Sequence, residues 1–139
     1  KMDQNDGRVI CNFIVQALKS KPLTVYGDGN QTRSFCYVKD LILGVTKLME
    51  SSYFAPINLG NPEEMTINQL AQIIKDMINP ELEIVYKPLP QPNDDPERRM
   101  PDIKLAKNIL NWQPSISINE GLSETINWFR KNIEFNKTE

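Results

Sequence analysis

Pro22-Leu-Thr-Val-Tyr-Gly-Asp-Gly-Asn-Gln-Thr-Arg-Ser-Phe-Cys-Tyr-Val-Lys-Asp40 is the most informative stretch of this chain. It contains a β-prone segment at 23–26, a Gly-Asp-Gly turn at 27–29 and an apolar segment at 35–38. This order predicts two short strands joined through a tight turn. Arg33 follows the turn, and its guanidinium is a planar fork of donors that suits a phosphate group.

Apolar residues recur at helical spacing in the rest of the chain. The spacing predicts helices over about 7–20, 41–49, 66–77, 102–110 and 117–133. Thr66-Ile-Asn-Gln69 and Ser117-Ile-Asn-Glu120 have the capping-box pattern, and Asp102 is a predicted N-cap. Two more short strands are expected at 56–60 and 83–86, whereas five prolines between 87 and 101 exclude regular structure there.

The pattern of short strands separated by helices is typical of an α/β fold. A self-sufficient parallel sheet needs several strongly apolar strands, and here they are few and brief. We therefore expect these strands to add to a sheet whose main part lies elsewhere.

Composition excludes several classes of function. The chain has 139 residues, 40% of them hydrophobic, and a net charge of −2, which gives no reason to expect nucleic acid as a partner. No apolar run approaches the ~20 residues that span a bilayer. Histidine is absent, and the two cysteines, Cys11 and Cys36, are expected to be buried thiols rather than zinc ligands or a disulfide framework.

Five stretches, in order, resemble the UDP-glucuronic acid decarboxylases (UDP-xylose synthases), which are extended short-chain dehydrogenases/reductases acting on nucleotide sugars. The resemblance runs from residue 1 to about residue 135. The stretches are Asn5-Asp-Gly-Arg-Val9, Pro22-Leu-Thr-Val-Tyr-Gly27, Gln31-Thr-Arg-Ser-Phe-Cys-Tyr-Val38, Ile57-Asn-Leu-Gly-Asn-Pro-Glu63, and Asp94-Asp-Pro-Glu-Arg-Arg99 followed by Pro101-Asp-Ile103.

The resemblance implies that residues 1–139 are the C-terminal, substrate-binding part of such an enzyme. The family's glycine-rich turn, which holds NAD, and its Tyr-x-x-x-Lys pair do not occur in this sequence. NAD would therefore be bound by a preceding part, and the segment alone is expected to be inactive. In the family, NAD-mediated oxidation at C4 of UDP-glucuronate permits decarboxylation, and re-reduction gives UDP-xylose without a metal.

The resemblance also assigns site residues. Arg33 and Arg99 would bind the diphosphate of the UDP-sugar, with Arg98 as the adjacent alternative to Arg99. Asp102 would receive the ribose hydroxyls, or act only as a helix cap. For Arg33 the alternative is a surface arginine paired with Asp28 or Asp40.

Three further assignments concern the base and the sugar. Thr24 and Tyr26 lie two apart on a predicted strand, hence on one face, which would meet the uracil. Asn58 would contact the ligand at a strand end, the edge where open α/β sheets bind ligands, or else satisfy only the backbone. Arg8, at a helix start, would contact the glucuronate carboxylate and orient it for loss of CO₂, or be solvated.

Two other functions stay open. One is a sugar-nucleotide 4,6-dehydratase or 4-epimerase, and the other is a non-catalytic domain that holds a UDP-sugar. The resemblance implies a homodimer for the intact enzyme. It also implies a cytoplasmic location, or the Golgi lumen for an animal form, with no membrane contact from this segment.

Overall fold

The computed structural model describes residues 8–88 and 98–133. Residues 5–7 and 94–97 of the motifs above, and most of the proline-rich stretch, lie outside this part of the chain. The described elements are α1 (Val9–Leu18), β1 (Leu23–Tyr26), β2 (Thr32–Ser34), α2 (Val38–Glu50), β3 (Glu64–Thr66), α3 (Ile67–Ile78), β4 (Ile84–Lys87), β5 (Arg98–Arg99), α4 (Lys104–Leu110) and α5 (Ile118–Asn132).

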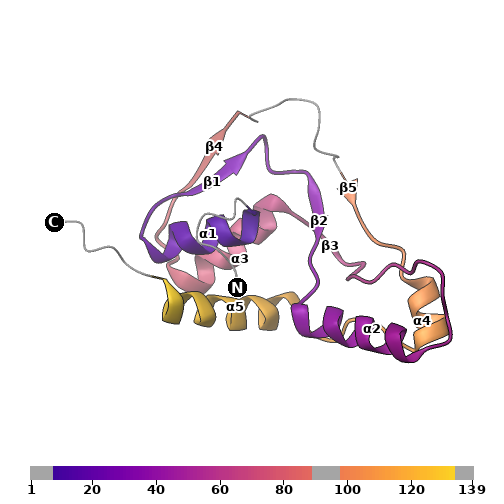
Figure 1. Cartoon of the computed structure of the whole chain (residues 1–139). Coiled ribbons are helices and arrows are strands. Elements are labelled where there is room, and N and C mark those ends of the chain that lie inside the picture. Colours follow the sequence, from indigo (N-terminus) through magenta and orange to yellow (C-terminus); the bar gives the residue numbers. More distant parts are fainter. Residues whose placement is uncertain (1–7, 89–97, 134–139) are drawn as a thin grey trace.

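The strands form two small sheets. β1 pairs in parallel with β4, from Leu23 opposite Ile84 to Tyr26 opposite Lys87. In the second sheet β2 lies centrally, antiparallel to β3 and parallel to β5. Figure 1 shows this second sheet between a group containing α1, α3 and α5 and a group containing α2 and α4.

Two hydrophobic clusters correspond to these groups. The larger is built on α1, β1, α3 and α5, with Phe13, Ile14, Leu70 and Phe129 among its fully buried side chains. The smaller joins α4 and Trp112 to Leu48, Ile57 and Leu59. The amphipathic patterns of 7–20, 66–77 and 117–133 thus correctly predicted α1, α3 and α5, and β1 lies where it was expected.

Helix α2 is present, but of its apolar residues only Leu48 packs on a described cluster, the smaller one. Its buried residues are Asp40 and Gly44, whereas Val38, Leu41, Ile42, Leu43, Val45 and Met49 are exposed. Gly44 is buried because Trp112 packs on it: a Cβ there would lie 2.9 Å from a ring carbon of Trp112. Most of the apolar surface of α2 therefore lies outside both clusters.

Two predicted strands are wrong, and so is the absence of regular structure expected over 87–101, because β4 reaches Lys87 and β5 is Arg98–Arg99. Residues 35–37 are irregular and Val38 already begins α2, because the Tyr37 carbonyl accepts the helical hydrogen bond from Leu41 N. The strand of this region is β2, three residues earlier. Residues 56–60 are also irregular, since no other strand of the described chain pairs with them.

Helix starts follow the capping predictions in part. Thr66 and Gln69 form the full capping box, with Gln69 N donating to Thr66 Oγ1 at 3.1 Å and Thr66 N donating to Gln69 Oε1 at 2.8 Å. Ser117 Oγ accepts from Glu120 N at 3.2 Å. Asp102 is not the N-cap of α4: that position is Ile103, and Asp102 Oδ1 accepts from Lys104 N at 2.9 Å instead.

Within the part of the chain that the structure describes, no helix has the length and apolarity needed to cross a membrane. Cys11 is buried and Cys36 is half-buried, and both are thiols.

Candidate functional site

The register of the second sheet brings Arg33 and Arg99 together. β2 and β5 run in parallel, with Thr32 opposite Arg98 and Arg33 opposite Arg99. Because side chains alternate between the faces of a strand, directly paired residues share a face. The two arginines therefore stand side by side on one face, and Met65 of β3 continues that face beyond Arg33.

Arg33 is held close to its own backbone. It is half-buried, its Nη2 atom is buried, and its Nη1 atom donates to the Thr32 carbonyl at 2.6 Å. Of its two proposed acidic partners, Asp28 accepts from Asn30 N and Asn30 Nδ2, each at 2.9 Å. These bonds, the backbone one first, hold the pKa of Asp28 below its usual range.

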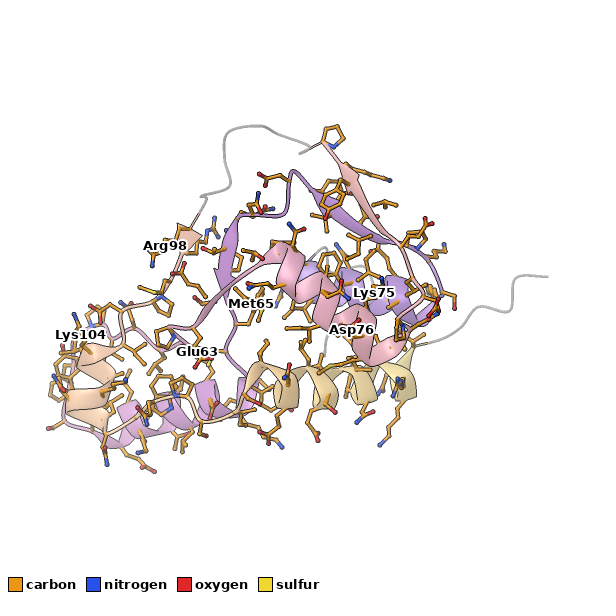
Figure 2. All side chains as sticks on the ribbon, turned by 180° about the vertical axis from the view of Figure 1, so that it is seen from behind. Glu63, Met65, Lys75, Asp76, Arg98 and Lys104 are labelled. Atoms are coloured by element: carbon orange, nitrogen blue, oxygen red, sulfur yellow. The ribbon has the colours of Figure 1, made fainter. Side chains whose placement is uncertain are left out.

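The opposite face of the same sheet carries an ion pair. Arg98 Nε donates to both carboxylate oxygens of Glu64, at 2.9 and 2.8 Å, and Arg98 Nη2 also donates to Glu64 Oε2. Thr32 Oγ1 donates to Glu64 Oε1 at 2.7 Å. Figure 2 shows Arg98 on β5, at the edge of this sheet. Of the two adjacent arginines, Arg98 is therefore bound to Glu64, and Arg99 is the neighbour of Arg33.

Thr24 and Tyr26 share one face of β1, because Leu23 and Val25 are both buried on the other face. Gln16 of α1 binds Thr24 twice: Thr24 N donates to Gln16 Oε1 at 3.0 Å, and Gln16 Nε2 donates to Thr24 Oγ1 at 3.2 Å. Tyr26 keeps 43% of its surface exposed. The tyrosine ring is thus available to a ligand, while Thr24 links β1 to α1.

Asn58 and Asp102 lie on two segments that pack together. A Cβ on Gly60 would lie 2.8 Å from Pro101 Cγ, so the segment around Asn58 runs beside the one before α4. Both polar residues are exposed. Asn58 points away from the smaller cluster, which takes its neighbours Ile57 and Leu59.

Arg8 lies at the edge of a separate cavity of about 410 Å³. Arg8 is exposed and is the N-cap residue of α1. The cavity is otherwise largely apolar, and Arg33 and Arg99 are not part of its wall. It is lined by Arg8, Val9, Ile10, Cys11, Phe35, Cys36, Tyr37, Val38, Leu41, Ile116, Ser117, Ile118, Gly121, Leu122 and Thr125.

Cys36 lines this wall together with a second thiol, that of Cys11. Burial, and then the negative charge of Asp40, raise the pKa of Cys36 above the ordinary value of a cysteine. The thiol is therefore neutral at physiological pH and contributes an apolar surface to the cavity.

Asp40 is a structural residue that the sequence reasoning missed as such. Its side chain is buried and accepts from Ser115 N at 3.0 Å, Ser115 Oγ at 3.0 Å and Ile116 N at 2.9 Å. Its backbone carbonyl accepts from Trp112 Nε1 at 2.9 Å. An aspartate directly before the apolar segment Leu41–Leu43 was the available signal, because a carboxylate is buried only when it is hydrogen-bonded.

Comparisons with known proteins place this geometry in a family. Residues 2–125 match the family described as GDP-mannose 4,6 dehydratase. A UDP-glucuronic acid decarboxylase 1 from Danio rerio is 50% identical over 134 residues, which are 96% of this chain and 32% of that protein. The corresponding protein 1 from Arabidopsis thaliana is 49% identical over 133 residues, 96% of this chain and 30% of that protein.

Solved structures agree on the fold. A UDP-glucose 4-epimerase from Thermotoga maritima, solved with UDP-glucose, superposes with a TM-score of 0.86 at 31% identity, covering 94% of this chain and 41% of that one. A UDP-glucuronic acid 4-epimerase from Bacillus cereus, solved with UDP-glucuronic acid and NAD, gives 0.80 at 26% identity, covering 91% and 41%.

The chain spans about a third of the length of the curated relatives that it matches. The match to the family model covers most of the chain, and the superpositions extend over nine tenths of it. On these grounds the chain belongs to the family described as GDP-mannose 4,6 dehydratase, within the extended short-chain dehydrogenases/reductases.

Proposed function

We propose that this chain is the sugar-nucleotide-binding portion of an NAD-dependent UDP-glucuronate decarboxylase, and that Arg33 and Arg99 bind the diphosphate. The observation that carries the proposal is their direct pairing across β2 and β5. Neighbouring strands lie about 4.8 Å apart. Two guanidinium groups projecting from one face at that spacing can each take one phosphoryl group of a diphosphate.

The like charges of Arg33 and Arg99 also support a diphosphate site. Like charges directly opposite each other on a sheet destabilise it. A bound dianion offsets that repulsion, because its oxygens carry a charge opposite to that of both guanidinium groups. The pairing of two like charges on one face therefore favours an anion beside them.

The remaining residues are proposed to surround the two ends of the UDP-sugar. The exposed ring of Tyr26, at the end of β1 next to the Gly27–Gly29 turn, would pack against uracil. Asp102, exposed beside the start of α4, would accept from the ribose hydroxyls, and Asn58 would donate to the ligand from the adjoining segment.

Arg8 is proposed to bind the glucuronate carboxylate. Its place at the rim of a largely apolar cavity supports this role, because a guanidinium beside a low-dielectric surface attracts a carboxylate more strongly than one in open water. Holding the carboxylate at one position would orient the bond that breaks when CO₂ is lost.

The described residues do not fit NAD. A dinucleotide needs a glycine-rich turn that leads into a helix N-terminus, and the described glycines instead form the 27–29 turn or stand alone. We propose that NAD is held by another part of a longer protein, where it would accept and return the hydride at C4. The exposed apolar surface of α2 supports a covering polypeptide, since Met49 alone keeps 80% of its surface exposed.

A 4-epimerase is the second candidate, because solved 4-epimerases superpose on nine tenths of the chain at about 30% identity. The product separates the two: a longer protein that carries this chain should form UDP-xylose and CO₂ from UDP-glucuronate, whereas an epimerase would form UDP-galacturonate. A homodimer and a cytoplasmic location stay predictions from the resemblance, to be tested by sedimentation and by localisation of the longer protein.

Titration of the 139-residue chain with UDP tests the site itself. Arg33→Ala and Arg99→Ala should each raise the dissociation constant about tenfold or more, since a hydrogen bond to a charged group contributes about 1.5–3 kcal/mol. Arg130→Ala, an exposed arginine of α5, removes the same charge elsewhere and is the matched control. Unchanged UDP affinity in both site variants would refute the proposed diphosphate site.

A further inference from the structure

We propose that Glu64 is a positioning residue for the diphosphate site: by binding Arg98 it fixes β5 in the register that places Arg99 beside Arg33. The inference rests on the proposed function. It concerns the face of the sheet opposite to the ligand, which the proposed site does not use.

The contacts are those of a strong ion pair. Arg98 reaches both oxygens of Glu64, and Thr32 of β2 donates to the same carboxylate, so one side chain of β3 binds both other strands of the sheet. Exposed ion pairs contribute little in general, but geometry of this kind is the exception. Glu64 keeps only 17% of its side chain exposed. The hydrogen bonds from Arg98, and then from Thr32, hold its pKa below the usual value, so it is ionised at neutral pH.

Strand β5 is short and lies at the edge of the sheet. It contains two residues, Arg98 and Arg99, and both are exposed. It pairs with β2, and Ser34 Oγ of β2 also donates to the Arg99 carbonyl at 3.1 Å. A two-residue strand at a sheet edge has weakly specified register, and a shift of one residue would exchange Arg98 and Arg99 between the faces. The ion pair with Glu64 opposes that exchange.

The inference predicts that Glu64→Gln weakens UDP binding, whereas the change of charge alone would strengthen it. Glu64→Gln removes a negative charge near a site for a dianion, which by itself would strengthen UDP binding. Loss of positioning would instead weaken it. Glu63→Gln is the matched control, because it removes the same charge one residue earlier, and Figure 2 shows Glu63 lying apart from Arg98.

The experiment titrates UDP and UMP into the 139-residue chain and its variants by NMR. Glu64→Gln and Arg98→Gln should each weaken UDP binding about two- to fivefold, the range expected for one exposed ion pair, and weaken UMP binding less. The double variant should be no weaker than either single one, because both substitutions break the same contact. Glu63→Gln should bind UDP as well as the unaltered chain, or slightly better.

Two results would overturn the inference. The first is a Glu64→Gln chain that binds UDP as tightly as the unaltered chain or more tightly. The second is losses for Glu64→Gln and Arg98→Gln that add in the double variant, which would mean that Arg98 binds the diphosphate itself. Arg33→Ala and Arg99→Ala are measured in parallel. If they weaken binding and Glu64→Gln does not, only the positioning role fails; if neither weakens binding, the proposed site fails with it.

Discussion

Asp40→Ala tests whether one buried carboxylate connects α2 to the segment that leads into α5. Its oxygens accept from two backbone amides and one hydroxyl, all at 2.9–3.0 Å, and only 3% of the residue is exposed. Truncation to alanine removes every one of these acceptors and leaves the donors of Ser115 and Ile116 behind.

The magnitude follows from those donors. A buried donor without a partner costs about 1–3 kcal/mol, and two backbone amides lose theirs. Ser115 is exposed, so water can replace the carboxylate at one of them, which places the expected loss at about 2–4 kcal/mol. Asp40 also lies in the first turn of α2, where a negative charge adds about 0.3–1 kcal/mol.

Urea denaturation followed by tryptophan fluorescence is a suitable assay, because Trp112 donates to the backbone of Asp40 and reports on the same region. Asp40→Asn keeps an oxygen for the two amides and should lose only about 1–2 kcal/mol, while Ser115→Ala removes one hydroxyl and should lose about 1 kcal/mol. Glu50→Ala, at the exposed end of the same helix, is the control for charge. An Asp40→Ala chain as stable as Glu50→Ala would refute the reasoning.

Three other perturbations have defined outcomes. Gly29→Ala should destabilise the chain by about 1–3 kcal/mol in the same assay, because φ is +74° and the new Cβ would overlap Asn68 Oδ1; equal stability would contradict this. The folded-state pKa of Glu64 is lowered, so its stabilising contact with Arg98 should be fully present above about pH 4.3, the pKa of an unfolded glutamate, and lost as the pH falls further. The stability difference between the unaltered chain and Glu64→Gln should therefore vanish in acid, and a difference that persists at pH 2 would contradict this. Cys36, whose pKa is raised, should react with iodoacetamide at pH 8 more slowly than a free cysteine and approach its rate only in more alkaline solution; reaction at the rate of free cysteine at pH 8 would contradict this.

The local patterns in the sequence predicted the elements whose neighbours are close in the chain. The apolar spacing of Phe13, Ile14 and Ala17 predicted the buried face of α1, and Thr66 with Gln69 predicted the start of α3. The same reasoning failed for residues 35–38. An apolar run of four residues is compatible with a strand or a helix. Here the Tyr37 carbonyl accepts the first helical hydrogen bond, so α2 begins at Val38.

For α2, the sequence pattern predicted the helix correctly but not the exposure of most of its apolar residues. Its periodicity predicted a helix with a core-facing side, and the helix exists. Burial, however, depends on what packs against that side, and within the described chain it is Gly44 that receives the ring of Trp112.

For the candidate site, the sequence supplied the residue types and their order: an arginine after a Gly-Asp-Gly turn, and two adjacent arginines before α4. It could not choose between Arg98 and Arg99, because neither spacing nor composition specifies which strand they join. In the fold, pairing between distant segments sets Arg99 beside Arg33 and directs Arg98 to Glu64, which is the basis for proposing Arg99. Helical faces and caps depend on neighbours three or four residues away, whereas strand register depends on contacts that exist only after the chain has folded.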